Sequence, residues 1–265
     1  MRIVVPIKQV PETDNVKMDE QTGTMVREGV ESIINPLDLY AIELALVLRE
    51  QYGGEVTAIS MGPAQAVRAL REALAMGCDS AVLLSDKAFA GSDTWATSYV
   101  LQAAIRRLGE VDLVICGERA TDGETGQVGP AIAAMLDLPA ATYVSQFEAP
   151  EDGHIRVRRL VEGGWQVLRL TLPALLTVVK EVSQPRLPTL RGKQRARAAD
   201  IPVWQAGDLD VETDKLGLAG SPTRVVRIHR PKVARQCRKL RANDADSTAA
   251  AVDEVLILLR ERELI

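Results

Sequence analysis

Histidine and cysteine are both scarce in this sequence. Its 265 residues include only two histidines, His154 and His229, and three cysteines, Cys78, Cys116 and Cys237. They do not group into the Ser/His/Asp, His-x-x-x-His or Cys/His arrangements of hydrolases and metal sites. Three widely separated cysteines predict neither a disulfide framework nor a zinc site, which fits a reducing cytoplasm. Any chemistry is therefore expected to belong to a bound cofactor.

Aromatic residues and long apolar runs are also lacking. Aromatics make up 3% of the chain, and no apolar run approaches the roughly 20 residues that span a bilayer. We expect no membrane insertion, and we interpret the N-terminal apolar run as a first strand because Lys8 interrupts it. Two segments are basic and free of acids, 184–197 and 224–241. With a net charge of −4 and no interleaved aromatics, they favour docking on an acidic protein partner over nucleic acid.

Strand-like and helix-like segments alternate through the first half of the chain. This pattern predicts an α/β fold, in which a parallel sheet is flanked by helices in a Rossmann-like, nucleotide-binding arrangement. Residues 16–27 interrupt the alternation and predict a small hairpin. The predicted strands are 2–10, 55–61, 80–85 and 111–116, and the predicted helices are 37–50, 64–76 and 94–108.

The pattern changes to β from about residue 140, which predicts an added β segment. Its expected strands are 141–147, 155–160, 166–172 and 174–179. After residue 183 the chain becomes basic and proline-punctuated, and an amphipathic helix is predicted at 249–262. We divide the chain into an α/β domain at 1–183, a segment at 184–202 and an extended C-terminal arm with its helix at 203–265.

Candidate binding residues follow the predicted strands, where open α/β sheets hold ligands. Gly62-Pro63 makes a turn after 55–61. Asn35 before Pro36 is a good helix cap, and capping alone could explain it. In the segment 90–98, free amides and hydroxyls at a helix start suit an anion, although Asp93 could simply be the N-cap. These two readings are compatible.

The loop at 117–130 is the strongest of these segments. Four glycines follow a predicted strand and precede a helix beginning near Pro130. Backbone without side chains can approach a ligand closely, which suits a nucleotide phosphate or ribose. The loop matches neither the P-loop nor the G-x-G-x-x-G fingerprint.

The chain resembles the β subunit of electron-transfer flavoproteins over nearly its whole length. The matching motifs are Val5-Pro6-Ile7-Lys8-Gln9-Val10-Pro11, Asn35-Pro36-Leu37-Asp38, Met61-Gly62-Pro63-Ala64-Gln65, Ala73-Leu74-Ala75-Met76-Gly77, the loop 117–129 and Leu170-Thr171-Leu172-Pro173-Ala174. The resemblance implies a nucleotide-binding α/β domain packed against an α subunit that carries an electron-carrying FAD. Common members hold AMP in this subunit, while another group holds a second FAD there.

The chain looks like the second, electron-bifurcating group, on the segments 85–98, 122–130 and 190–193. That resemblance implies hydride transfer from NADH and electron delivery to a dehydrogenase, acting on an acyl-CoA or another substrate, and to ferredoxin or flavodoxin. Thr121, Glu124 and Gly126 depart mildly from the family pattern. The implied cofactor-binding residues are Pro6, Asn35, Asp38, Met61, Phe89, Gly91, Asp93, Thr94, Thr97, Gly117, Arg119, Thr121, Asp122, Thr125, Gly126, Gln127 and Val128, with Gln9, Pro11 and Thr13 near NADH.

The resemblance also implies partner contacts. Segment 184–202 is the expected partner-recognition loop, with Leu190 as the residue that inserts into the dehydrogenase and with Arg191 and Lys193 beside it. Its basic residues, Arg186, Arg195 and Arg197 included, would attract an acidic partner. Segment 203–265 is expected to dock on the α subunit.

Two alternatives stay open. One is a respiratory-type electron shuttle with AMP in this subunit. The other, of a different class, is a universal-stress-type ATP-binding signalling module, which leaves the β segment and the basic arm unexplained.

Overall fold

The computed structural model describes residues 1–12, 32–226 and 239–265. The chain forms two compact units, residues 1–227 and 228–265, which are described separately. Thr13 and the hairpin expected at 16–27 lie outside the described residues.

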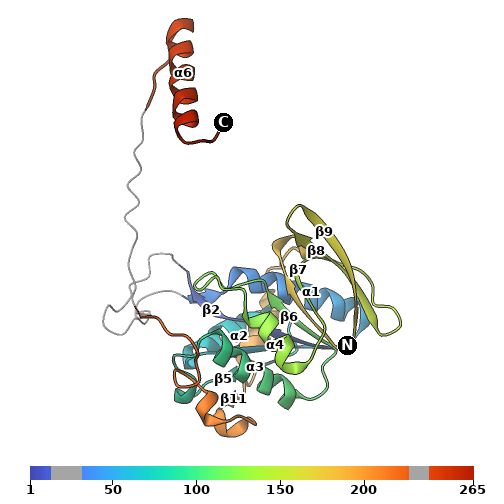
Figure 1. Ribbon diagram of the computed structural model, residues 1–265. Helices are drawn as coiled ribbons and strands as arrows, with labels where there is room; N and C mark the ends of the chain where they lie inside the picture. The colour runs from blue at the N-terminus through green and yellow to red at the C-terminus, as the bar shows by residue number, and fades with distance from the viewer. Residues whose placement is uncertain (13–31, 227–238) are drawn as a thin grey trace. The chain divides into compact units, whose positions relative to one another are not determined.

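The described part of the first unit is built on a nine-stranded sheet with the order β11-β5-β4-β1-β6-β10-β7-β8-β9 (Figure 1). Neighbouring strands from β11 to β7 are parallel, and β8 and β9 are antiparallel. The α/β class and the added β segment are confirmed. The strands are β1 Arg2–Pro6, β4 Glu55–Met61, β5 Ser80–Leu84, β6 Leu113–Gly117, β7 Ala140–Phe147, β8 His154–Val161, β9 Gly164–Thr171, β10 Ala174–Val178 and β11 Val203–Trp204.

The predicted first strand is shorter than expected. It was predicted to run from residue 2 to residue 10, but β1 ends at Pro6. Gln9–Pro11 form a separate strand, β2, which pairs antiparallel with β3, Ser32–Ile34. The break occurs because the Lys8 amide donates to the Asp38 carboxylate rather than to a neighbouring strand.

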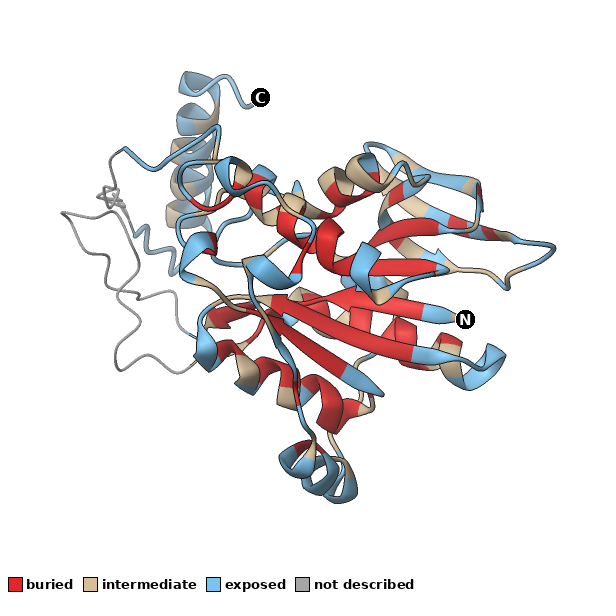
Figure 2. Ribbon diagram, turned by 90° about the horizontal axis from the view of Figure 1, so that it is seen from below, coloured by how far each residue is buried: buried red, intermediate tan, exposed pale blue. Residues whose placement is uncertain are grey.

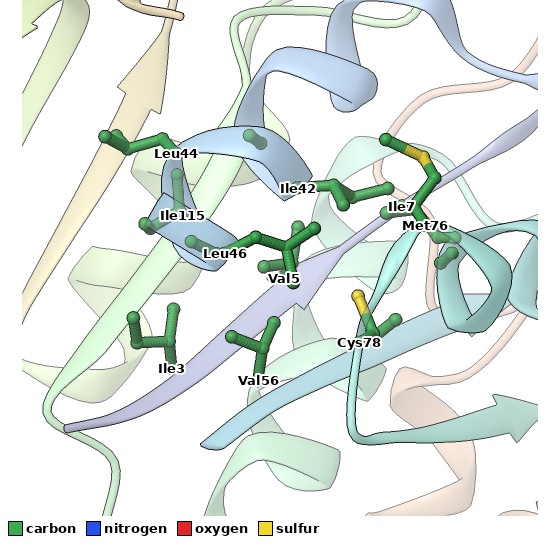
Figure 3. Close-up of a cluster of buried hydrophobic side chains, with 14 of the residues drawn as sticks. Ile3, Val5, Ile7, Ile42, Leu44, Leu46, Val56, Met76, Cys78 and Ile115 are labelled. Atoms are coloured by element: carbon green, nitrogen blue, oxygen red, sulfur yellow. The ribbon is translucent and has the colours of Figure 1, made fainter. Parts of the chain in front are cut away.

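Helices cover both faces of the sheet, which explains why its central strands are apolar on both sides. Ile3 and Val5 of β1 pack in one core cluster with α1 and α2 (Figure 3), whereas Val4 packs in a second cluster with α3 and α4. The alternation follows from the two-residue period of a strand. Buried residues accordingly follow the sheet and the inner helix faces (Figure 2). The helices are α1 Pro36–Tyr52, α2 Val67–Met76, α3 Thr94–Leu108, α4 Val128–Leu136 and α5 Leu190–Ala198.

The strand order reverses beside β1. The chain passes from β1 to β4 and β5 on one side, and then returns to β6 on the other side. The connections leaving β1 and β6 therefore diverge at the carboxyl edge, where open α/β sheets form their binding crevice. This topology positions the candidate site.

Residues 203–226 belong to the first unit, although the sequence placed them in the C-terminal arm. Val203 and Trp204 of β11 extend the sheet by pairing in parallel with β5. The described part of the second unit contains α6, Ala245–Glu261, with Asp244 and Ser247 forming a capping box. Its Val252, Val255 and Leu258 side chains are exposed.

No helix within the described ranges is both long and apolar enough to cross a membrane.

Candidate functional site

An ion pair joins the connections that leave β1 and β6. Lys8 Nζ lies 2.6 Å from Asp122 Oδ1, although the two residues are 114 positions apart in sequence. Asp122 belongs to the glycine loop, residues 117–129, which the sequence singled out. The pair fixes this loop across the topological switch point.

Asn35 and Asp38 hold the glycine loop from the protein interior. The Asn35 side-chain amide donates to the Asp38 carboxylate at 2.9 Å and to the Arg119 carbonyl at 2.9 Å. Asn35 Oδ1 accepts from the Thr121 amide at 3.1 Å, and Asp38 Oδ2 accepts from the Lys8 amide at 2.7 Å. Asn35 and Asp38 are 0% and 6% exposed. The polar side-chain atoms of Asn35 and Asp38 thus form hydrogen bonds within the protein, and these bonds position the loop.

Gly117 leaves room for this arrangement. A Cβ atom there would overlap Asp38 Oδ1 and would lie 2.9 Å from the backbone carbon of Leu37. Burial raises the pKa of Asp38 to about 7, against hydrogen bonds from Asn35, Lys8 and Gly117 that favour its ionised form. The start of the loop therefore rests on a buried carboxyl that binds its proton unusually tightly.

Asp93 caps α3, as its helix-cap interpretation predicted. Asp93 Oδ1 accepts from the amides of Trp95 and Ala96 at 3.0 and 3.1 Å. Asp93 Oδ2 accepts from the amide and the hydroxyl of Thr223 at 2.9 and 2.7 Å. Partial burial opposes ionisation, but these hydrogen bonds hold the pKa of Asp93 below its usual value. The α3 end thus already carries a negative charge.

The start of α4 differs, because no side chain caps it. Gln127 occupies its N-cap position without a side-chain hydrogen bond to the helix. The first-turn amides of an uncapped helix are donors that suit an anion. Thr94 Oγ1 of α3 lies 2.9 Å from Gln127 Oε1, so the two helix starts meet.

These groups fit a nucleotide phosphate. Thr94 and Thr97 lie on successive turns of α3 and are partly exposed, and Thr125 is exposed in the loop. A Cβ at Gly123 would meet nothing within 4 Å, so this part of the loop is open. Hydroxyls, uncapped amides and open glycine backbone are the donors expected around phosphate. The described residues contain no cluster of three or more His, Cys, Asp or Glu that could hold a metal.

Other predicted residues are scattered around this centre. Phe89 is 5% exposed and packs in the second core cluster. Pro6 is buried and Met61 half-buried at their strand ends, while Arg119 pairs with Glu118 at 2.8 Å. The Gln9 side-chain amide donates to the Gln65 carbonyl at 3.3 Å. Of the residues expected near NADH, Pro11 ends β2, and Thr13 lies outside the described residues.

Sequence reasoning missed three residues that support the site: Lys8, Ser221 and Thr223. Ser221 Oγ accepts from the Asp93 amide at 2.8 Å, so residues 221–223 bind the start of α3 from a distant part of the chain. Lys8 stood within a matched motif without an assigned partner. Single-sequence patterns carry no signal for such long-range pairs.

The segment around Leu190 is not simply a loop. Leu190 begins α5, which Thr189 caps by accepting from the Gly192 amide at 3.0 Å. Arg186 binds Glu43 at 2.9 Å and also pairs with Glu50, and Arg195 donates to the Leu74 carbonyl at 2.9 Å. These two arginines hold the segment in place, so they are not free to form a basic rim.

Two leucines project from this anchored segment. Leu187 is 88% exposed and Leu190 is 82% exposed. A cavity of about 230 Å³ lies beside Leu190, lined by Ala75, Met76, Gly77, Thr189, Arg191, Gly192 and Arg195.

The chain matches the model of the electron transfer flavoprotein domain over residues 22–209. It is 50% identical over 236 residues to an electron transfer flavoprotein subunit beta of Thermoanaerobacterium thermosaccharolyticum, covering 89% of this chain and 90% of that protein. It is 48% identical to CarD, a subunit of the caffeyl-CoA reductase-Etf complex of Acetobacterium woodii, covering 87% and 88%. It is 45% identical to the protein FixA of Azorhizobium caulinodans, covering 95% and 91%.

Proposed function

The chain belongs to the electron transfer flavoprotein family as a β subunit, a partner of an α subunit in electron transfer, and we propose that it binds an FAD of its own. The proposed site is the crevice between the connections that follow β1 and β6. An FAD bound there would accept hydride from NADH and pass its two electrons on separately. One electron would go to the FAD of the α subunit and then to a dehydrogenase, and the other to ferredoxin or flavodoxin.

The contact between Thr94 and Gln127 carries this proposal. It places the α3 hydroxyls beside the uncapped start of α4. One phosphate can use the amides of α4 with Thr125, as AMP would require. A second phosphate, which FAD has and AMP lacks, needs further donors, and Thr94 and Thr97 offer hydroxyls from α3. Thr94, whose hydroxyl donates to Gln127 Oε1 at 2.9 Å, would turn this hydroxyl to the phosphate when FAD binds.

The remaining residues of the site hold the glycine loop in position. Asn35 and Asp38 fix the beginning of the loop, and the Lys8–Asp122 ion pair fixes its middle. Direct hydride transfer between bound nicotinamide and flavin would require no protein acid or base. The scarcity of histidine agrees with a protein that positions the cofactor and leaves the chemistry to it.

We propose a flavin dehydrogenase as one partner. The A. woodii relative is by name a subunit of a complex with a caffeyl-CoA reductase, which supports a CoA thioester as the substrate class. Leu190, with Arg191 and Lys193, is the proposed contact with that dehydrogenase. The second unit, with the exposed apolar side chains of α6, is the proposed contact with the α subunit. Cys78 and Cys116 are free thiols, which supports the cytoplasm as the location.

The test is to replace Thr94 and Thr97 together by valine in the co-expressed αβ heterodimer. Valine keeps the side-chain shape, and each lost hydrogen bond to a charged group costs roughly 1.5–3 kcal/mol. FAD content should fall from two towards one per heterodimer, and reduction by NADH should be lost. Thr171→Val, an exposed position on the edge strand β9, is the matched control and should keep both flavins.

One FAD and one AMP per wild-type heterodimer would contradict the proposal and favour the respiratory-type shuttle. In that case the double valine variant should retain AMP. Family membership excludes the signalling-module alternative, because the match to the family model includes the whole added β segment and the segment around Leu190.

A further inference from the structure

Tyr143 adopts a backbone conformation that a tyrosine rarely takes. Its φ is +58°, and among the described residues other than glycine it is the only one with positive φ inside a strand. The others lie in turns, in loops or at helix ends. Such a conformation costs of the order of 1–3 kcal/mol at a bulky residue and persists where the surroundings enforce it.

The conformation belongs to an irregularity in the sheet. The pairing of β7 with β10 changes register between Leu176 and Val178. Thr177, which is 2% exposed, accepts a hydrogen bond from the Tyr143 amide at 3.1 Å. The methyl group of Thr177 lies 2.5 Å from the position that a Cβ on Gly129 would occupy. One buried residue thus contacts both the bulge and the start of α4.

The bulge lies at the level of the binding crevice. Val144 is paired with Val178, which is paired in turn with Gly117 at the carboxyl end of β6. The Tyr143 hydroxyl lies 3.8 Å from the position that a Cβ on Gly126 would take. Tyr143 is 44% exposed, and within the described ranges its hydroxyl has no hydrogen-bond partner. The phenol therefore reaches the glycine loop with a free donor.

We propose that Tyr143 is a ligand-binding residue of the nucleotide site, and that the bulge aims its hydroxyl across Gly126 at a phosphate or ribose oxygen. This inference rests on the proposed nucleotide site, but not on which nucleotide fills it. AMP and FAD share the phosphate and ribose that the hydroxyl would contact. A regular strand would turn this side chain away from the loop, which accounts for the retention of a strained tyrosine at a position suited to glycine.

The experiment uses αβ heterodimers carrying Tyr143→Phe or Tyr143→Gly, with Tyr52→Phe as the control. Tyr52 is 42% exposed at the end of α1 and is matched to Tyr143 in exposure. Nucleotide is identified by extraction and removed by dialysis, and the Kd values for FAD and AMP are then measured. Loss of one hydrogen bond to a charged group predicts at least a tenfold weaker Kd for Tyr143→Phe. Tyr52→Phe should match the wild type.

Tyr143→Gly separates ligand binding from a structural role. Glycine accepts positive φ without strain, so the melting temperature of the nucleotide-free heterodimer should stay the same or rise. The Kd should still weaken at least tenfold. A Kd within twofold of wild type for Tyr143→Phe would overturn the inference, as would a lower melting temperature of nucleotide-free Tyr143→Gly with unchanged affinity. Extraction of AMP alone would refute the second FAD, while the AMP measurements would still test Tyr143.

Discussion

Replacing Gly117 by alanine tests the idea that a buried support shapes the glycine loop. The new Cβ would overlap Asp38 Oδ1 and would lie 2.9 Å from the Leu37 backbone carbon and 3.0 Å from the Asp38 amide nitrogen. Two of these three atoms belong to the backbone at the start of α1. They cannot move as a flexible side chain would, so either the helix start or the loop must shift.

The cost follows from overpacking and from the bonds around Asp38. Inserting a methyl group into a packed site typically costs about 1–3 kcal/mol, and the backbone contacts favour the upper part of that range. Displacement of Asp38 would also loosen its hydrogen bonds with Lys8 and Asn35, which hold the loop. We expect the melting temperature of the αβ heterodimer to fall by about 5–10 °C, at about 2–4 °C per kcal/mol. Bound nucleotide should fall with it.

Gly123→Ala is the matched control in the same loop. Its Cβ would meet nothing within 4 Å, and its φ is not positive. Alanine there should leave the protein unchanged or stabilise it by about 0.4–1 kcal/mol, through the lower entropy of the unfolded chain. Thermal melting and nucleotide extraction on both variants decide the matter. Equal melting temperatures and equal nucleotide contents for Gly117→Ala and Gly123→Ala would refute the buried support.

Two further predictions concern Asp38 and Leu190. Because the pKa of Asp38 rises from 3.8 to about 7 on folding, the folded state keeps a proton that the unfolded state releases. Its contribution should therefore lower the free energy of unfolding, by up to about 4 kcal/mol, as pH rises from about 4 to about 7. Asp38→Asn should show a flatter dependence of melting temperature on pH between 5 and 8, and an unchanged slope would contradict this role. Leu190→Ala should weaken binding to the cognate dehydrogenase by about 2 kcal/mol and leave NADH oxidation with an artificial acceptor unchanged. A parallel fall in both activities would contradict a role confined to dehydrogenase binding.

Local signals were sufficient for much of the fold. The helix predicted at residues 94–108 matches α3, because Asp93 supplies the cap and Gly109 follows its end. The glycine loop was identified because its residues lie together in the sequence and follow a strongly apolar strand. Both features are encoded within about 15 neighbouring residues, which is the range that propensity and capping rules address.

Features that depend on distant partners could not be found this way. The predicted first strand continued to residue 10 because its apolar pattern continues, but the Lys8 amide is captured by Asp38, 30 residues away. The sequence predicts that Arg186 and Arg195 attract an acidic partner protein, yet they bind Glu43 and the Leu74 carbonyl, more than 100 residues earlier in the same chain. A single sequence gives no measure of such contacts, so buried roles for polar residues were missed.

The buried support also changes how the variable positions of the site should be interpreted. The side chains of Asn35 and Asp38 bind Lys8, Arg119, Thr121 and each other. On the proposed function they would therefore support the same loop with either AMP or FAD. On the proposed function, the exposed donors on α3 and in the loop would then select between those nucleotides. Gly126, one of the departures from the family pattern, has φ +63°, a conformation that glycine adopts at lower cost than a residue with a side chain. Its missing methyl group also leaves space beside the Tyr143 hydroxyl. On the proposed function, this departure therefore leaves room beside the hydroxyl that we infer to bind the nucleotide.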